Sequence, residues 1–139
     1  MIRIYFDASV IIAAMLSPTG GSAKLIQFVK LGAVFGITSQ TAIAEIEEHA
    51  FKIGKTTSKI RQFIQDSGII VREKINKAEE EPYQGLVEKE DIHIVAGAKL
   101  TKCDYLVTLD KKHLLKDEVK KLAKPLRIVN PKEYLEKLV

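Results

Sequence analysis

A short apolar segment near the N-terminus sharply limits the folds open to this chain. Residues Ile2–Phe6 are apolar except for Arg3, and Asp7 follows them directly. A strand that is covered on both faces loses the alternation of apolar and polar side chains, as is typical of parallel sheets. The segment therefore predicts a central parallel strand with a carboxylate at its exit.

Predicted strands and helices alternate along the rest of the chain. Further strands are expected at Ala33–Ile37, Ile69–Val71, Tyr105–Leu109 and Arg127–Val129. Helices are expected after the caps Ser9, Ser22 and Thr38-Ser39, over 55–66, from Lys89 or Glu90 to Lys102, and from Asn130-Pro131 onward. The third helix carries apolar residues as far as Ile53, and the polar segment 74–83, broken at Pro82, gives no decisive prediction. This alternation predicts an α/β fold, a three-layer α/β/α sandwich with a central parallel sheet, formed by residues 1–139 as one domain.

Composition narrows the functional classes. Hydrophobic residues make up 46% of the chain and charged residues 29%, a balance typical of soluble globular proteins. No apolar run approaches the ~18 residues that span a bilayer, and no secretory signal is recognisable, so a cytoplasmic protein without a membrane segment is expected. Cys103 is the only cysteine, which excludes an internal disulfide and argues against a zinc cluster. The net charge of +4 suits a polyanionic partner but does not decide for one.

Four carboxylates are predicted to meet at one edge of the sheet, beyond the carboxyl ends of the strands where ligands bind in such folds. Asp7 and Asp110 each follow an apolar strand. Asp91 lies in the first turn of a helix that runs antiparallel to the next strand, so it reaches the same edge. Glu45 lies in the first two turns of the helix that leaves the second strand.

Each acid also has a purely structural explanation. Asp7 is a possible helix cap, Asp91 suits the positive end of a helix dipole, and Asp110 suits a turn. The helical period does not distinguish Glu45 from Glu47, because the two flank the same apolar stripe on opposite sides. Together, however, unpaired carboxylates repel one another, and oxygen ligands suit the hard cations Mg²⁺ and Mn²⁺. Such ions promote phosphodiester hydrolysis.

Three blocks of the chain resemble PIN domains, a family of metal-dependent ribonucleases. They are FDASVIIAAM, TAIAEIEE and EDIHIVAGAKLTKCDYLVTLDKKHL, in the family's order over nearly the whole chain. The resemblance implies a metal site of Asp7, Glu45, Asp91 and Asp110, and so favours Glu45 over Glu47. It also implies that the hydroxyls of Ser9 and Thr108 act beside these carboxylates.

The single-domain form looks most like VapC-type toxins. This resemblance implies an RNA substrate, an antitoxin protein as partner and a homodimer or higher homo-oligomer. Two other functions stay open: a catalytically silent PIN-like module that binds RNA or protein, and a phosphoacceptor signalling domain. The second expects adjacent acids after the first strand, whereas this chain has Asp7-Ala8-Ser9.

Several remaining polar residues are given structural or surface roles. His49, His93 and His113 are dispersed and form no zinc-like pair, so surface or partly buried structural positions are expected. Lys111 and Lys112 adjoin Asp110, where they either contact RNA phosphates or are simply solvated.

Overall fold

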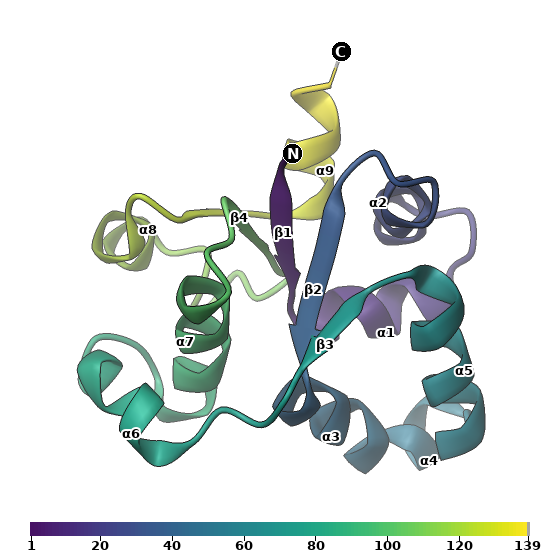
Figure 1. Cartoon of the computed structure of the whole chain (residues 1–139), viewed down its shortest axis with the longest axis horizontal. Coiled ribbons are helices and arrows are strands. Elements are labelled where there is room, and N and C mark those ends of the chain that lie inside the picture. The colour runs from purple at the N-terminus through teal and green to yellow at the C-terminus, as the bar shows by residue number, and fades with distance from the viewer. Residues whose placement is uncertain (139) are drawn as a thin grey trace.

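A five-stranded parallel sheet forms the middle layer of the molecule (Figure 1). In the computed structural model, which describes residues 1–138, the strands are β1 Arg3–Phe6, β2 Phe35–Ser39, β3 Ile70–Arg72, β4 Tyr105–Val107 and β5 Arg127–Val129. Their order is β3-β2-β1-β4-β5, so β1 is central and pairs in parallel with β2 and β4. The predicted α/β sandwich is confirmed.

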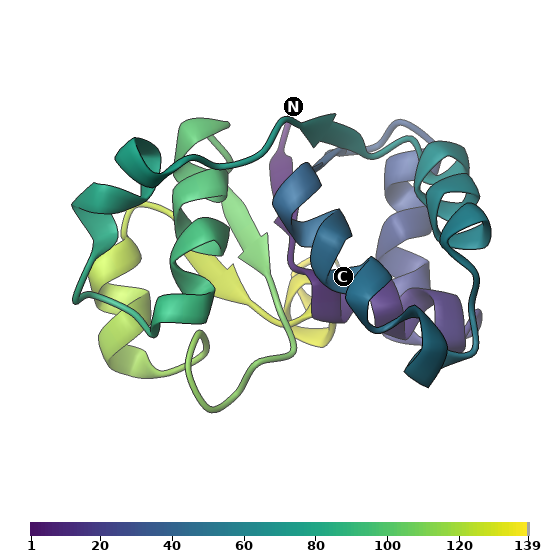
Figure 2. The same cartoon turned by 90° about the horizontal axis from the view of Figure 1, so that it is seen from below.

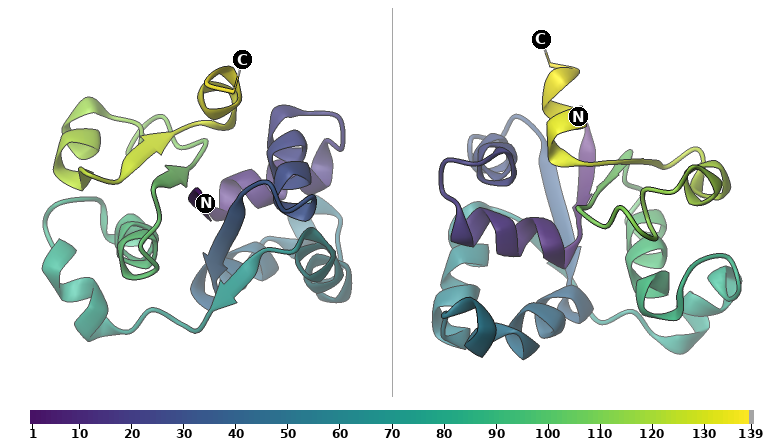
Figure 3. Two further views of the ribbon diagram at one scale, coloured as in Figure 1. Left: turned by 45° about the horizontal axis from the view of Figure 1, so that its top comes forward. Right: turned by 180° about the vertical axis from the view of Figure 1, so that it is seen from behind.

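Helices cover both faces of the sheet (Figure 3). On one face lie α1 Ala8–Leu16, α2 Gly21–Lys30, α3 Gln40–Glu48, α4 Ala50–Ile53, α5 Thr57–Ser67 and α9 Pro131–Glu136. On the other face lie α6 Lys77–Glu80, α7 Ile92–Leu100 and α8 Asp117–Ala123, with the short 3₁₀ helices η1 Glu81–Tyr83 and η2 Lys89–Asp91. Between residues 1 and 138, none of the helices is long and apolar enough to cross a membrane by itself.

The central strand contributes to two apolar cores, which explains why its sequence is apolar apart from Arg3. Ile4 and Phe6 are fully buried against the layer that contains α1, α2 and α5. Tyr5 points to the other face and is fully buried with residues of α7 and α8. A strand with two covered faces is what the apolar segment predicts.

Gly97 allows α7 to approach β1 closely. A Cβ atom at this position would lie 2.5 Å from the hydroxyl oxygen of Tyr5 and 2.7 Å from its Cζ. The Tyr5 ring cannot move aside easily, because it is fully buried and its hydroxyl donates to Ser39 Oγ at 2.9 Å. The close packing sets the position of α7, and therefore of Asp91 at its N-terminal end.

Several predicted boundaries are wrong at the ends of elements. Helix α1 begins at Ala8, so Ser9 lies inside it and is not its cap. Helix α2 is preceded by Gly20 rather than capped by Ser22. The helix predicted to reach Ile53 is interrupted at His49, where α3 ends and α4 begins. The cap at Ser39 is correct, since its hydroxyl accepts from the Ala42 N–H at 3.2 Å.

Two helices lie where none was predicted. Helix α6 begins with a capping box, in which Asn76 accepts from the Glu79 N–H at 2.9 Å and Glu79 accepts from the Asn76 N–H at 3.0 Å. Pro82 does not break this region but lies in η1, directly after α6. Helix α8 packs beside β5 and also went unpredicted.

Candidate functional site

All four predicted acids line one cavity of about 550 Å³. Asp7 follows β1, and Glu45 lies on α3. Asp91 ends η2 and occupies the N-cap position of α7, while Asp110 lies just past β4. The acids therefore come from four separate segments that meet at the carboxyl edge of the sheet, which Figure 2 shows from below.

Ser9 and Thr108 hold the carboxylate of Asp7. Both hydroxyls donate to Asp7 Oδ2, from Ser9 at 2.8 Å and from Thr108 at 2.7 Å. Asp7 is only 5% exposed, and this burial raises the pKa of its carboxyl. The two hydroxyl donors oppose that rise, whereas the nearby charge of Glu45 adds to it.

The same two hydroxyls also fix the backbone that carries Asp110. Ser9 Oγ accepts from the Leu109 N–H, and Thr108 Oγ1 accepts from the Asp110 N–H, both at 3.1 Å. Each hydroxyl thus donates to the carboxylate after β1 and accepts from the loop after β4. This arrangement links the position of Asp7 to that of Asp110.

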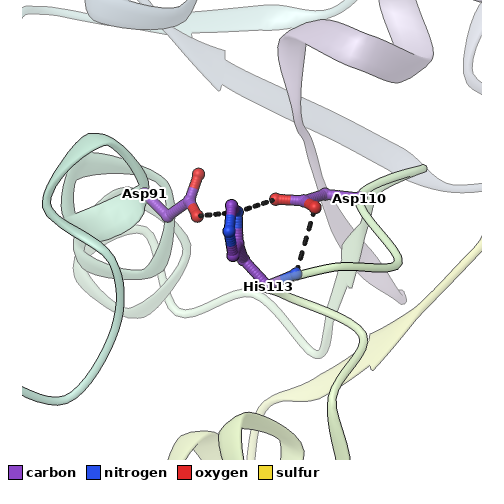
Figure 4. Close-up of side chains that lie close together, drawn as sticks. All are labelled: Asp91, Asp110 and His113. Atoms are coloured by element: carbon purple, nitrogen blue, oxygen red, sulfur yellow. Dashed lines mark hydrogen bonds and ion pairs between the residues drawn. The ribbon is translucent and has the colours of Figure 1, made fainter.

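Asp91, Asp110 and His113 form a tighter group within the site (Figure 4). One ligand atom from each residue lies within 4.8 Å of the others. His113 Nδ1 is 3.6 Å from Asp91 Oδ2 and 3.4 Å from Asp110 Oδ2, and the His113 N–H donates to Asp110 Oδ1 at 3.1 Å. Asp7 and Glu45 line the same cavity but do not join this group.

Within residues 1–138, Asp91 has fewer hydrogen bonds to its carboxylate than the other three acids. Its Oδ2 atom is buried and accepts no hydrogen bond from any described residue. Burial raises the pKa of Asp91 to about 6, with a further rise from the charge of Asp110 and an opposing effect of His113. An ionised carboxylate in this position is stabilised by a cation.

The structure places Glu45, and not Glu47, on the cavity. Glu45 Oε1 forms a hydrogen bond with Nε2 of the buried His93. Burial by itself lowers the pKa of His93, but the hydrogen bond and charge of Glu45 outweigh it and raise the pKa. Glu47 points elsewhere and pairs with the exposed Arg61 at 3.0 Å.

Two histidines contact the acids, a placement that the sequence interpretation missed. His113 lies three residues after Asp110 in a turn, a spacing that brings the two side chains close. His93 occurs in the otherwise apolar run Ile92–Ala98, where a buried imidazole needs a polar partner. His49 also lines the cavity, but it is exposed.

The donor set fits a hard divalent cation. Carboxylate oxygens from several segments line one cavity, and a buried oxygen of Asp91 accepts no hydrogen bond from any residue that the structure describes. Mg²⁺ and Mn²⁺ prefer such oxygen ligands and relieve the repulsion between them. The histidine nitrogen of His113 is a further donor within reach.

The raised pKa of Asp91 predicts a specific dependence of stability on pH in metal-free protein. Between about pH 4 and pH 6, folded Asp91 keeps a proton that an unfolded aspartate has released, so the free energy of unfolding falls as pH rises. Asp91→Asn removes this contribution. Urea unfolding in EDTA should show wild type losing stability relative to Asp91→Asn across this window. Parallel pH profiles for the two proteins would contradict the raised pKa of Asp91 in the folded protein.

Comparisons with known proteins agree with the site and fold. A family model described as the PIN domain matches residues 3–112. A chain of VapBC2 from Rickettsia felis, solved bound to a promoter DNA fragment, aligns with a TM-score of 0.64 and 14% identity, covering 93% of this chain and 98% of that chain. FitAcB from Neisseria gonorrhoeae gives a TM-score of 0.61 and 16% identity, covering 93% of this chain and 98% of that chain.

A third structure is VapC20 from Mycobacterium tuberculosis, a toxin that cleaves the sarcin–ricin loop. It aligns with a TM-score of 0.57 and 13% identity, covering 78% of this chain and 91% of that chain. No match was found among curated protein sequences. At these identities the structures show a shared fold, while the family model spans most of the chain. The chain therefore belongs to the PIN domain family.

Proposed function

We propose that this protein is a metal-dependent ribonuclease that hydrolyses RNA phosphodiester bonds. The observation that supports the proposal is the meeting of four carboxylates from separate segments in one cavity, with a buried Asp91 oxygen that accepts no hydrogen bond from the described residues. Asp7, Glu45, Asp91 and Asp110 would hold one or two Mg²⁺ or Mn²⁺ ions. When bound, such ions activate water and stabilise charge on the oxygens of the attacked phosphate.

The protein side chains have positioning roles in this proposal. Ser9 and Thr108 keep the Asp7 carboxylate in one orientation, since both donate to the same oxygen. His93 holds Glu45 through the hydrogen bond between its Nε2 atom and Glu45 Oε1. Preorganised ligands of this kind lose little conformational freedom when an ion binds.

A toxin role within a toxin–antitoxin pair is the biological setting that we propose. VapC20, which is described as a toxin, supports it by its shared fold, and VapBC2 and FitAcB share that fold as well. An antitoxin protein would then be the partner, and the toxin would form a homodimer or higher homo-oligomer. The alternative is a silent module that binds RNA or protein without cleaving it.

A nuclease assay with Asp7→Asn tests the proposed function. Wild type should cleave mixed single-stranded RNA in Mg²⁺ or Mn²⁺ and stop when EDTA is added. Asp7→Asn should lose cleavage, because a neutral amide is a poor ligand for a hard cation. Its metal-free stability should hold or rise, because the substitution keeps the size and removes a charge from a repelling cluster.

Two results would contradict the metal mechanism. Cleavage that survives complete chelation would rule out a dependence on divalent ions. Marked unfolding of Asp7→Asn would show that the carboxylate serves the fold rather than an ion. Absence of cleavage under every metal condition, with RNA still bound, would favour the silent module.

Glu45 and Glu47 give a matched pair on one helix. Glu45→Gln should weaken metal binding and cleavage by at least about tenfold, the lower range for disturbed metal ligation. The glutamine can still accept from His93, so folding should be preserved. Glu47→Gln should change stability by no more than ~0.5 kcal/mol and leave cleavage intact, since its partner Arg61 is exposed. Calorimetric titration with Mn²⁺ and initial cleavage rates measure both effects, and equal losses would refute the role of Glu45.

A further inference from the structure

We infer that residues 111–124 form the surface that binds the phosphate backbone of the RNA beyond the cleavage site. We call this segment the lysine surface, and its assignment rests on the proposed ribonuclease function. It follows Asp110 directly and continues through α8. Figure 2 shows the chain leaving the carboxyl end of β4 and turning away from α1 and α3 towards α8.

The lysine surface has a net charge equal to that of the whole chain. It contains two acids, Asp117 and Glu118, and six lysines: Lys111, Lys112, Lys116, Lys120, Lys121 and Lys124. The segment therefore has a charge of +4, equal to that of the full sequence, and the remaining residues hold 16 basic and 16 acidic side chains. Residues 52–61 reach the same charge with Lys52, Lys55, Lys59 and Arg61, but they belong to α4, α5 and the turn between them rather than to the chain that leaves Asp110, and Arg61 is paired with Glu47.

The lysines of this segment are free to bind a ligand. All are exposed except Lys120, which is partly exposed. No described residue forms an ion pair with any of them. Lysines elsewhere in residues 1–138 are also without an ion pair, whereas Arg61 and Arg72 are paired with glutamates. Unpaired, solvated ammonium groups are the usual partners of nucleic-acid phosphates, and they bind them as point charges.

A second cavity lies beside the acidic cavity and is lined in part by residues of the lysine surface. It measures about 290 Å³ and is lined in part by His113, Lys89 and Lys116. His113 contacts both Asp91 and Asp110, so it forms the boundary between the two cavities. The second cavity is balanced in charge, since Glu88 and Glu118 line it as well.

The acidic cavity and the lysine surface have opposite charges. The acidic cavity is bordered by further exposed acids, Glu48 on α3 and Glu90 on η2, which repel phosphates. The second cavity is neutral. The two acids and two lysines of α8 cancel, so the excess charge of the lysine surface comes from the lysines that precede and follow this helix: Lys111, Lys112, Lys116 and Lys124. A strand with its scissile phosphate at the acids would therefore run past His113 and along the lysine surface.

RNA fits this surface better than an acidic protein does. The segment exposes few large apolar side chains, with Leu122 at 53% exposure, and lysine is depleted where protein interfaces are buried. The surface also begins at the residue after a proposed metal ligand, where a substrate must lie. An acidic polypeptide remains the competing ligand in the test below.

Two triple variants with the same change in charge test the inference. The first, Lys116→Gln/Lys120→Gln/Lys121→Gln, removes charge from the lysine surface. The second, Lys24→Gln/Lys30→Gln/Lys59→Gln, removes three exposed lysines from α2 and α5, on the opposite face of the sheet. Affinity for a short fluorescein-labelled single-stranded RNA is measured by anisotropy in EDTA, so that no metal-dependent cleavage occurs, over a range of salt concentrations.

The first variant should bind RNA about tenfold more weakly than wild type at low salt, and the second should bind like wild type. The slope of log affinity against log salt should fall by about 2 in the first variant, as expected when three phosphate contacts to a single strand are lost. Equal weakening by both variants, or none by the first, would overturn the inference. Binding of poly-glutamate, the acidic competitor, is measured in the same way. If the first variant loses poly-glutamate binding but keeps RNA binding, the inference is overturned and the surface is assigned to an acidic protein.

Cleavage assays separate this inference from the proposed function. Metal-dependent cleavage by wild type, together with unchanged RNA affinity in the first variant, would overturn the lysine surface and leave the ribonuclease function standing. If RNA binding depends on these lysines but wild type shows no metal-dependent cleavage, the proposed ribonuclease function fails and the lysine surface stands as an RNA-binding surface.

Discussion

Burying the carboxylate of Asp7 at the end of the central strand costs free energy unless hydrogen bonds compensate for it. Ser9 and Thr108 provide these bonds from two different elements, and both hydroxyls accept in turn from the backbone around Asp110. The contacts that allow Asp7 to be buried therefore also set the loop that carries Asp110. The geometry of the acidic cavity depends on this one small network.

The compensation is incomplete, and this points to an ion. Burial raises the pKa of both Asp7 and Asp91, which means that ionising these two carboxyls costs more free energy in the folded protein than in water. His93 and His113 offset part of the charge by lying against Glu45 and against the Asp91–Asp110 pair. A divalent cation would neutralise the remaining negative charge. The cluster of buried carboxylates is therefore consistent with a metal-binding site rather than with a purely structural role.

Sequence reasoning reaches the fold and most of the cavity because the positions of strands and the direction of helices are readable from apolar patterns, whereas the order of the strands was not predicted. The apolar run before Asp7 identifies the central strand, and alternation places Asp91 and Asp110 at the same edge. Periodicity could not choose Glu45 over Glu47, since the rotation of α3 depends on tertiary packing of Ile43 and Ile46. Helix α8 was missed for a related reason: seven residues are too few to form a stable helix without packing against the sheet.

The central claim is that the four acids hold a divalent cation, and crystals grown with MnCl₂ test it most directly. An anomalous difference map should show a manganese peak in the cavity, at coordination distance from the carboxylates of Asp7, Asp91 and Asp110, and crystals of Asp7→Asn should show a weaker peak or none. Well-ordered crystals with the cavity filled only by water at saturating manganese, or with manganese bound solely elsewhere, would contradict it.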